Sequence, residues 1–387
     1  MKGNLDNQAK IGLVSFYRDP NYGTMLQAYA LAASIRRLGK KCEYIQYRNH
    51  FKSTYPILVF RSIIKRFLTN LGLIHNEYEF KYYDNKEFRD IKEKYQYFVE
   101  HYIPISKNTY YADSIIYANE KYDNFIVGSD QTWSRFMTRN LEQYLFLGFV
   151  TDAMKKQSYA PSIGTTNIDD SYRSKLIEKI SGFSNLSCRE PENSKLLSSL
   201  LERHVESVVD PTLLLKKENW MSIVDNNYSL PSEKYILCYI LGVKECIASF
   251  AEKLGKQKGF PVYYILTRPE YLTKKKVLCD VGPRDFVNLI ANAEYVVTDS
   301  FHGTIFSINL NTDFYSFAKR TQAEGFNDND RILSILRPLG LKNRFHDDSD
   351  DEILPNIDFE AVMSKLEVLR SSSVAYLKKI VNNDGVQ

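Results

Sequence analysis

The sequence predicts an α/β protein with two domains, each built on a mostly parallel sheet covered by helices. Three observations support this prediction. A strand, a helix and a second strand follow one another at residues 11–47, units of strand and polar turn continue to residue 212, and a fresh series starts at residue 235. Strands and helices that alternate over short connections are typical of parallel sheets. The 387 residues suffice for two such domains, each with its own core.

The first unit begins with a compact apolar strand at residues 11–16. Residues 24–38 then have helical periodicity and end at Gly39, and residues 42–47 form the next strand. The loop before the helix brings its amino terminus to the sheet edge where ligands bind in such folds. Most Asn-Tyr-Gly turns only close a strand–helix connection, and this one is not a GxGxxG phosphate motif. The candidate binding residues in this loop are Asn21, Tyr22, Gly23 and Thr24.

Residues 49–120 interrupt the pattern. They are rich in tyrosine, phenylalanine and lysine with little alternation, which predicts a mostly helical insertion. Residues 56–74 within it are amphipathic and basic, through Arg61, Lys65 and Arg66. Such a segment can lie on an anionic membrane surface, but the favoured interpretation is a packing helix whose charged face meets water.

The sheet resumes at residues 122–127, which are followed by Gly128 and a polar run that ends in an indole. Loops at this edge of a sheet carry recognition, so the run is expected to form a pocket wall. Its candidate binding residues are Ser129, Asp130, Gln131 and Trp133. Similar strand-and-turn units are expected at residues 157–164, 185–190 and 208–212, with helices at 171–180 and 194–201 between them. Together these units describe one Rossmann-like domain over residues 1–220.

A polar stretch at residues 216–234 marks the boundary of a second Rossmann-like domain at residues 221–345. Its strands are expected at residues 235–240, 262–266, 294–297 and 314–317. One helix is expected to follow the first strand and end at about residue 258, and others are expected at 283–291, 304–310 and 331–339. Residues 346–387 follow, with a long amphipathic helix at 358–381 that is expected to cross back onto the first domain. Two such domains are expected to face each other across a ligand-binding cleft.

The turn at residues 298–304 is the most informative part of the second domain, because His302 lies between a buried strand and a helix. The helix dipole there favours a neutral imidazole, which could act as a base or a hydrogen-bond partner at neutral pH. A buried histidine satisfied by a backbone carbonyl explains the pattern equally well. The candidate site residues of this turn are Ser300, His302, Gly303 and Thr304.

The composition excludes several classes of protein. The 51 lysines and arginines are scattered among 47 acidic residues, which argues against a nucleic-acid surface. The five cysteines form no CxxC pair, so neither a disulfide framework nor a zinc ribbon is indicated, and a reducing compartment fits best. Without a signal-peptide pattern or a run of about 18 apolar residues, the chain is expected to be cytoplasmic, with contact to the inner face of the membrane left open.

Four segments resemble the polysaccharide pyruvyl transferase family. They occur in the family's order, span most of residues 11–340 and leave out the insertion and the tail. The segments are IGLVSFYRDPNYGTMLQAYAL (residues 11–31), FIVGSDQTW (125–133), SCREPENSKLL (187–197) and FVNLIANAEYVVTDSFHGTIF (286–306).

The resemblance implies a fold similar to that of the B-type glycosyltransferases. It also implies transfer of a pyruvyl group from phosphoenolpyruvate to a sugar diol of a bacterial surface polysaccharide or its lipid-linked precursor, giving a cyclic ketal and phosphate. No metal and no cofactor are implied, because phosphoenolpyruvate is a co-substrate. The family's essential histidine corresponds to His302 and its strand-end arginine to Arg189. Many members have an arginine where this chain has Ser300, so further anion anchoring is expected from Arg331, Arg268 or Arg284.

The residue types suit this chemistry. The guanidinium of Arg189 can grip the carboxylate or phosphate of the donor in bidentate fashion. An imidazole such as His302 is a suitable proton shuttle, which Asp299 could orient. Carboxylate and amide groups after the strand at 122–127 bond sugar hydroxyls, and the indole of Trp133 covers an apolar sugar face. The other five histidines are expected to be structural or solvated.

Two other functions compete with pyruvyl transfer. A nucleotide-sugar glycosyltransferase of the same fold would need a base-binding pocket in the second domain, and none is identifiable in the sequence. A catalytically silent scaffold of polysaccharide assembly is favoured by the missing arginine at position 300 and disfavoured by His302 and Arg189.

Overall fold

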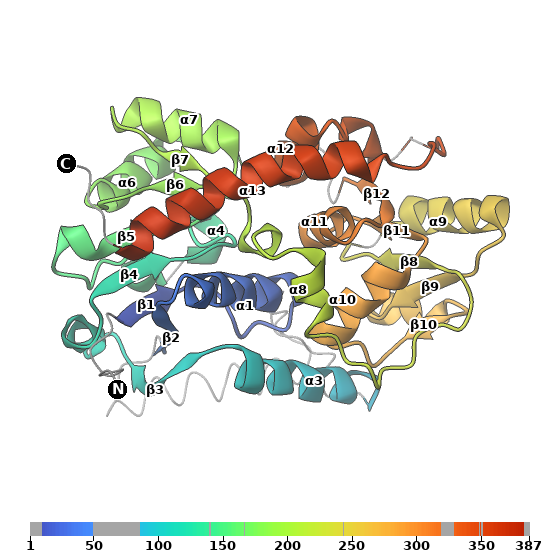
Figure 1. The fold of residues 1–387 in the computed structure, drawn as a ribbon, viewed down its shortest axis with the longest axis horizontal. Coiled ribbons are helices and arrows are strands. Elements are labelled where there is room, and N and C mark those ends of the chain that lie inside the picture. The colour runs from blue at the N-terminus through green and yellow to red at the C-terminus, as the bar shows by residue number, and fades with distance from the viewer. Residues whose placement is uncertain are drawn as a thin grey trace, which may run out of the picture.

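The computed structural model contains two parallel sheets flanked by helices, so the predicted α/β fold of two Rossmann-like domains is confirmed (Figure 1). It describes residues 10–48, 86–138, 141–165, 167–242, 244–318, 329–347, 349 and 351–382.

The first sheet has five parallel strands in the order β3-β2-β1-β4-β5. The strands are β1 (Lys10–Val14), β2 (Lys41–Tyr47), β3 (Ile105–Tyr110), β4 (Asn124–Val127) and β5 (Lys156–Ser158). Every residue of β4 is buried, as is typical of a central parallel strand that helices cover on both faces. A parallel two-stranded sheet of β6 (Ser187–Cys188) and β7 (Glu206–Ser207) continues this layer, because Gln157 of β5 is bridged to Asn185 just before β6.

The helices of this half follow the predicted pattern with shifted ends. They are α1 (Tyr22–Arg37), α3 (Lys86–Tyr102), α4 (Arg135–Thr138), α5 (Glu142–Leu145), α6 (Asp170–Ile180) and α7 (Pro191–Leu200). α1 begins two residues earlier than expected, because the side chain of Asn21 accepts a hydrogen bond from the backbone N–H of Thr24 and caps the helix. It ends before Gly39, whose φ of +77° is the left-handed conformation that glycine adopts easily.

Residues 49–120 are not wholly a helical insertion. α3 is helical as expected, but β3 pairs in parallel with β2 and forms the edge of the first sheet. Its sequence ISKNTY is half polar because an edge strand is only partly buried, and this hides the apolar signal that marks central strands. Residues 56–74 lie outside the described residues. Of the helices that the structure describes, none has the length and apolar run needed to cross a membrane.

The second sheet has six parallel strands in the order β10-β9-β8-β11-β12-β13. The strands are β8 (Ile236–Tyr239), β9 (Val262–Ile265), β10 (Val277–Leu278), β11 (Tyr295–Thr298), β12 (Asp313–Phe317) and β13 (Phe345–His346). The helices of this half are α8 (Lys217–Met221), α9 (Glu245–Lys258), α10 (Pro283–Asn292), α11 (Phe301–Leu310) and α12 (Asn329–Leu339).

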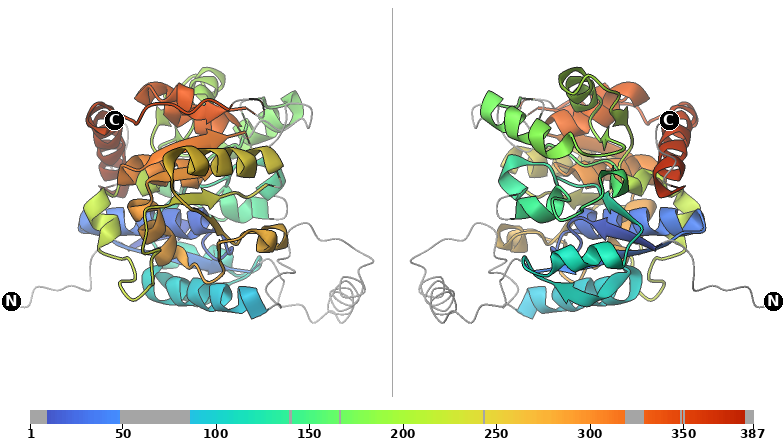
Figure 2. Two further views of the ribbon diagram at one scale, coloured as in Figure 1. Left: turned by 90° about the vertical axis from the view of Figure 1, so that its right-hand side faces the viewer. Right: turned by 90° about the vertical axis from the view of Figure 1, so that its left-hand side faces the viewer.

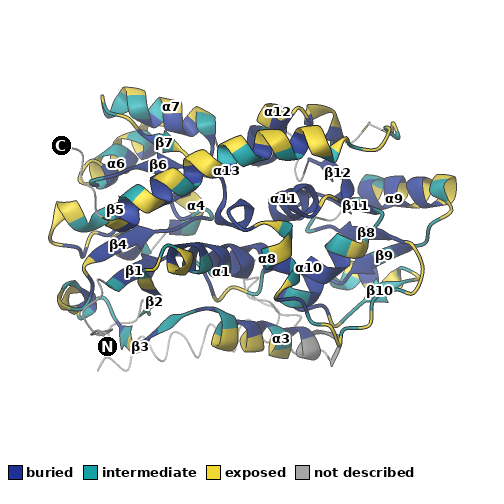
Figure 3. Cartoon of the chain, viewed as in Figure 1, coloured by how far each residue is buried: buried dark blue, intermediate teal, exposed yellow. Residues whose placement is uncertain are grey.

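One hydrophobic core joins the two halves, since residues of both sheets belong to the same buried cluster. Tyr22 of α1 stacks on Phe286 of α10, with ring centroids 4.6 Å apart. All ten residues of α11 and most of α1 are buried, so these two helices lie in the interior of the molecule (Figure 3). The amino termini of both helices are therefore positioned by packing on several sides.

The last helix, α13 (Phe359–Asn382), runs from the second half to the first (Figure 1). Arg370 donates from Nε to the backbone oxygen of Leu213 at 2.6 Å, and Tyr376 donates from its hydroxyl to the backbone oxygen of Ser158 at 3.0 Å. In the side views α13 lies in the upper half of the molecule and α3 along its lower edge (Figure 2). Buried and exposed residues alternate along α13, as expected of an amphipathic helix that lies on the surface (Figure 3).

Candidate active site

Residues that follow strands of both halves come together in one group, here called the histidine cluster. Two of its members lie in the first turns of the two buried helices, and three follow strands of the first half. The members are Gly23, Ser129, Arg189, Asp210 and His302. Parallel strands deliver their following turns to the same edge, which explains why residues far apart in the sequence meet here.

His302 is held in the first turn of α11. The helix starts at residue 301, earlier than the sequence suggested, because the side chain of Ser300 accepts a hydrogen bond from the N–H of Gly303 and caps it. The side chain of His302 is only 9% exposed. A Cβ atom at Gly23 would lie 1.9 Å from its Nδ1, so α1 can approach the ring only with glycine at this position.

The Nε2 atom of His302 has no hydrogen-bond partner among the described residues. Its neighbour is Oδ2 of Asp210 at 3.8 Å, a distance suited to an ion pair with a protonated ring and too long for a hydrogen bond. Within the described part of the chain, no backbone carbonyl therefore satisfies Nε2, as a purely structural histidine would require.

Asp210 is the centre of the cluster and is 1% exposed. Its Oδ2 accepts hydrogen bonds from Ser129 Oγ at 2.9 Å and from Arg189 Nη1 at 3.0 Å, while the N–H of Thr212 donates to Oδ1 at 3.0 Å. Burial alone would raise the pKa of this carboxyl, but His302, Arg189 and the Thr212 N–H outweigh it and hold the pKa well below its usual value. Asp210 is therefore ionised at neutral pH.

The sequence marked residues 208–212 as a polar turn after a strand but did not single out Asp210. The signal was the Asp-Pro-Thr run itself, in which an aspartate commonly caps the following turn. The capping bond to Thr212 exists, yet it uses only Oδ1 and leaves Oδ2 to face Arg189 and His302.

Arg189 follows β6 and is 5% exposed. Its Nε donates to Glu190 at 3.3 Å, and its plane lies over the ring of Phe301, 4.2 Å from the centroid. Burial alone would lower the pKa of this guanidinium, but Glu190, Asp210 and Asp130 raise it overall, so the charge is kept. Nη2 has no hydrogen-bond partner within the part of the chain that the structure describes.

The charge of Arg189 is offset by two buried carboxylates, so the arginine alone does not make this region strongly positive. A second guanidinium comes from Arg331 of α12, which is 8% exposed. With the carboxamide oxygen of Gln131 turned toward it, Gln131 accepts from Nη1 at 2.7 Å and from Nη2 at 3.2 Å. Residues after β4 and residues of α12 thus meet beside the cluster.

Asp130 connects the turn after β4 to α1. Its backbone has a φ of +74°, which is uncommon for a residue with a side chain, and its Oδ2 accepts a hydrogen bond from Thr24 Oγ1 at 2.8 Å. Thr24 and Asp130 therefore hold each other at the amino terminus of α1, and both are adjacent to members of the histidine cluster.

Trp133 does not lie on a pocket wall. Its indole is fully buried and packs against Phe146 and Phe183, with centroids 6.1 and 5.8 Å away. The turn after β4 folds back into the core of the first half, because burying a large aromatic ring is more favourable than leaving it in water. The expectation that Trp133 covers a sugar face is wrong.

Several other predicted binding residues have structural partners. Thr304 is fully buried and donates to the backbone oxygen of Ser300, and a Cβ at Gly303 would lie 2.5 Å from Thr298 Oγ1. The hydroxyl of Tyr22 donates to the backbone oxygen of Val281 at 3.0 Å. The side chains of Ser300 and Asn21 act as helix caps, as described above.

Asp299 does not orient His302. Its two carboxylate oxygens accept hydrogen bonds from the N–H groups of Leu241 and Gly242, both at 2.7 Å. Asp299 thus joins the turn after β8 to the end of β11 by hydrogen bonds. The carboxylate that faces the imidazole of His302 is that of Asp210.

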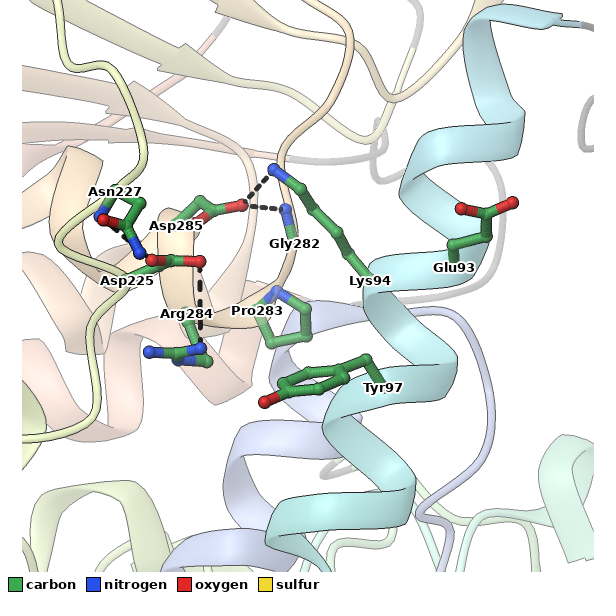
Figure 4. Close-up of a pocket in the computed structure, with 9 residues that line it drawn as sticks. All are labelled: Glu93, Lys94, Tyr97, Asp225, Asn227, Gly282, Pro283, Arg284 and Asp285. Carbon is green, nitrogen blue, oxygen red and sulfur yellow. Dashed lines mark hydrogen bonds and ion pairs between the residues drawn. The ribbon is translucent and has the colours of Figure 1, made fainter.

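Arg268 and Arg284, the two alternative anion anchors, are engaged elsewhere. The Nε of Arg268 donates to the backbone oxygen of Leu241, and Arg284 donates to the backbone oxygens of Ile223 and Val224 at 2.6 and 2.9 Å. Arg284 lines a cavity of about 580 Å³ between α3 and the start of α10 (Figure 4). There Lys94 pairs with Asp285 at 2.8 Å and Arg284 with Asp225 at 3.8 Å, so carboxylates already face both cations. Of the three candidates, Arg331 is the one beside the cluster.

In comparisons with known proteins, a family model described as polysaccharide pyruvyl transferase matches residues 21–319, which include all five members of the histidine cluster. A comparison with curated proteins finds no match.

Several solved structures are similar to the chain. The UDP-GlcNAc 2-epimerase from Methanocaldococcus jannaschii is 12% identical with a TM-score of 0.46, over 93% of this chain and 92% of that one. The glycosyltransferase SnogD from Streptomyces nogalater is 11% identical with a TM-score of 0.46, over 98% and 100%. The UDP-GlcNAc 2-epimerase from Neisseria meningitidis is 10% identical with a TM-score of 0.44, over 96% and 94%.

Proposed function

Because this chain belongs to the polysaccharide pyruvyl transferase family, we propose that it transfers the pyruvyl group of phosphoenolpyruvate to two hydroxyls of one sugar. The products are a cyclic pyruvate ketal and phosphate. The acceptor is a surface polysaccharide or its lipid-linked precursor, and the chemistry requires no metal or further cofactor.

The observation that carries this proposal is that two buried side chains, His302 and Arg189, face the same carboxylate and each keep a nitrogen without a hydrogen bond to any described residue. Nε2 of His302 and Nη1 of Arg189 both face Oδ2 of Asp210, at 3.8 and 3.0 Å. Nε2 of the histidine and Nη2 of the arginine make no hydrogen bond to any described residue. Buried polar atoms are almost always hydrogen-bonded in proteins, so two such atoms side by side favour a site that binds a polar substrate.

The reaction moves two protons from the acceptor hydroxyls, one to C3 of the donor and one to the departing phosphate. The first sugar hydroxyl adds to C2 of phosphoenolpyruvate: its oxygen bonds to C2, its proton passes to His302, and His302 delivers a proton to C3, which becomes a methyl group. The second hydroxyl then bonds to C2 while the bond from C2 to the phosphate oxygen breaks, and phosphate leaves with the second proton. Asp210 stabilises the imidazolium formed between the two proton transfers.

Several groups can hold the anionic donor. The guanidinium of Arg189 is charged, rigid and has one uncommitted nitrogen, and Arg331 supplies a second guanidinium from α12. The amino termini of α1 and α11 add N–H donors without adding charge. Because Asp210 and Glu190 offset Arg189, we expect donor affinity to depend on both arginines.

Replacing Arg189 with lysine tests the anchoring role. Lysine keeps the charge but loses the planar fork, so donor affinity should fall at least tenfold, which corresponds to about 1.5–3 kcal/mol for a charge-assisted hydrogen bond. Calorimetric titration with phosphoenolpyruvate measures this. Arg173→Lys is the matched control, because Arg173 is partly exposed and pairs with Asp170 within α6. Unchanged donor binding in Arg189→Lys would remove Arg189 from the donor site.

Thermal-shift measurements separate this proposal from the other functions. A ligand that binds only the folded protein raises its melting temperature. Phosphoenolpyruvate should raise it, while a panel of nucleotide sugars should not. The opposite pattern would favour a glycosyltransferase, and no shift with any ligand would favour a silent scaffold.

Peripheral contact with the membrane is the alternative left open for the basic segment, because lipid-linked acceptors are anchored there. The basic segment at residues 56–74 is the candidate contact. Binding to anionic vesicles should weaken with salt and when Arg61, Lys65 and Arg66 are replaced by glutamine. Failure to co-sediment with such vesicles at low salt would rule out this contact.

A further inference from the structure

A small cavity lies beside the histidine cluster, on the surface of the first half. Its volume is about 190 Å³, and it lies between the start of α4 and the loop that precedes α6. The lining residues used below are Gln131, Arg135, Phe136, Gly164, Asn167 and Asp169. Pockets for drug-sized ligands typically measure about 300–1,000 Å³, so this cavity suits a ligand with a single ring.

The lining combines hydrogen-bonding groups with aromatic surface. The amides of Gln131 and Asn167 offer donors and acceptors, and Phe136, which is 43% exposed, adds aromatic surface. Arg135 forms an ion pair with Asp169, so the cavity has little net charge to attract an anion. Polar groups around an exposed ring suit a sugar, which carries hydroxyls at its edge and C–H groups on its faces.

The cavity shares a residue with the surroundings of the histidine cluster. Gln131 lines it and also contacts Arg331, and its neighbour Asp130 is bonded to Thr24 at the start of α1. Gly164 borders the same cavity with a φ of +87°, and a Cβ there would lie 3.1 Å from the carboxamide of Gln131. Glycine at this position therefore keeps the amide of Gln131 accessible from the cavity.

We propose that this cavity binds one neutral sugar ring of the acceptor, with the ring face on Phe136 and the hydroxyls on Gln131, Asn167 and the Arg135–Asp169 pair. The proposal rests on the proposed pyruvyl transfer for its link to the reaction. In this proposal Phe136 covers the apolar face of the sugar, the role expected of Trp133 from the sequence. Phe136 lies three residues after Trp133 and faces outward.

The test measures sugar and donor binding separately. Wild-type protein is titrated with methyl glycosides of glucose, galactose and mannose, and in a second series with phosphoenolpyruvate. We expect at least one glycoside to bind, Phe136→Ala and Arg135→Ala each to weaken that binding at least tenfold, and phosphoenolpyruvate affinity to stay within twofold. The controls are Tyr117→Ala, an exposed aromatic in a separate 3-10 helix, and Lys175→Ala, an exposed ion-paired cation on α6.

The outcomes distinguish this proposal from the proposed reaction. Glycoside binding that is lost in the two variants, without any binding of phosphoenolpyruvate, supports the sugar site and contradicts pyruvyl transfer. Donor binding together with glycoside binding that survives both substitutions overturns the sugar site alone. A wild-type protein that binds none of the three glycosides at tens of millimolar also overturns it.

Discussion

Replacing His302 with asparagine is expected to abolish pyruvyl transfer while the protein stays folded. Asparagine has a similar reach and can hydrogen-bond, but it cannot carry a proton at neutral pH. Losing a general acid–base group typically lowers the rate by about 10²–10⁴-fold. The variant should keep its affinity for phosphoenolpyruvate and a melting temperature close to wild type, while phosphate release in the presence of acceptor collapses.

His204→Asn is the matched control, because His204 is solvent-exposed and pairs only with Glu206 among the residues described. Its turnover should equal that of the wild type. Near-normal turnover in His302→Asn would exclude His302 from the mechanism. A large drop in melting temperature would instead indicate that this buried ring, packed against Gly23, mainly serves stability.

Replacing Asp210 with asparagine is expected to lower both the turnover and the free energy of unfolding. The amide oxygen can still accept from the N–H of Thr212, but an amide nitrogen in place of Oδ2 cannot accept from Ser129 or Arg189. The variant therefore no longer balances the charge of Arg189 or stabilises a protonated His302. Breaking a buried ion pair costs about 3–5 kcal/mol, and we expect the free energy of unfolding to fall by that amount. Turnover should fall as well, with donor affinity less affected.

The pH dependence of stability distinguishes this effect from a packing defect. The folded pKa of Asp210 lies below its unfolded value, so its charge stabilises the fold fully above the unfolded pKa of about 3.9, and this contribution is lost as pH falls toward the folded pKa. The stability gap between wild type and Asp210→Asn should therefore be constant from about pH 7 to pH 5 and narrow below about pH 4. Denaturant unfolding at these pH values measures it.

Asp351→Asn provides the control for charge loss, since Asp351 is exposed and pairs with Lys253 at the surface. It should change stability little at any of these pH values. A gap for Asp210→Asn that stays the same down to pH 3 would mean that the charge of Asp210 does not stabilise the fold.

Most strands and helices could be predicted from the sequence because buried parallel strands leave continuous apolar runs. β4, β8 and β11 have this signature. β4 and β8 lie within their predicted ranges, and β11 ends one residue beyond its predicted range. β3 does not, because an edge strand needs only one buried neighbour and tolerates polar residues. The start of α11 was also misplaced, since the cap by Ser300 depends on backbone angles that periodicity does not contain.

The candidate site could be predicted only in part. The turns containing Arg189 and His302 were identifiable, because polar residues after buried strands indicate the ligand-binding edge of a sheet. Which carboxylate faces His302 was not, because Asp299 is adjacent in sequence whereas Asp210 is brought there by the packing of the two halves. Trp133 was misjudged for a related reason: a turn can direct a side chain outward or back into the core, and the pattern is the same for both.

The crossing of α13 has a consequence for the order in which the protein matures during synthesis. The first sheet leaves the ribosome early, but its surface around Ser158 and Asn124 is covered by Tyr376 and by the backbone of Ile380, which are translated only after the whole second half. The first half is thus completed after the second, and until then it presents uncovered apolar surface to chaperones and proteases.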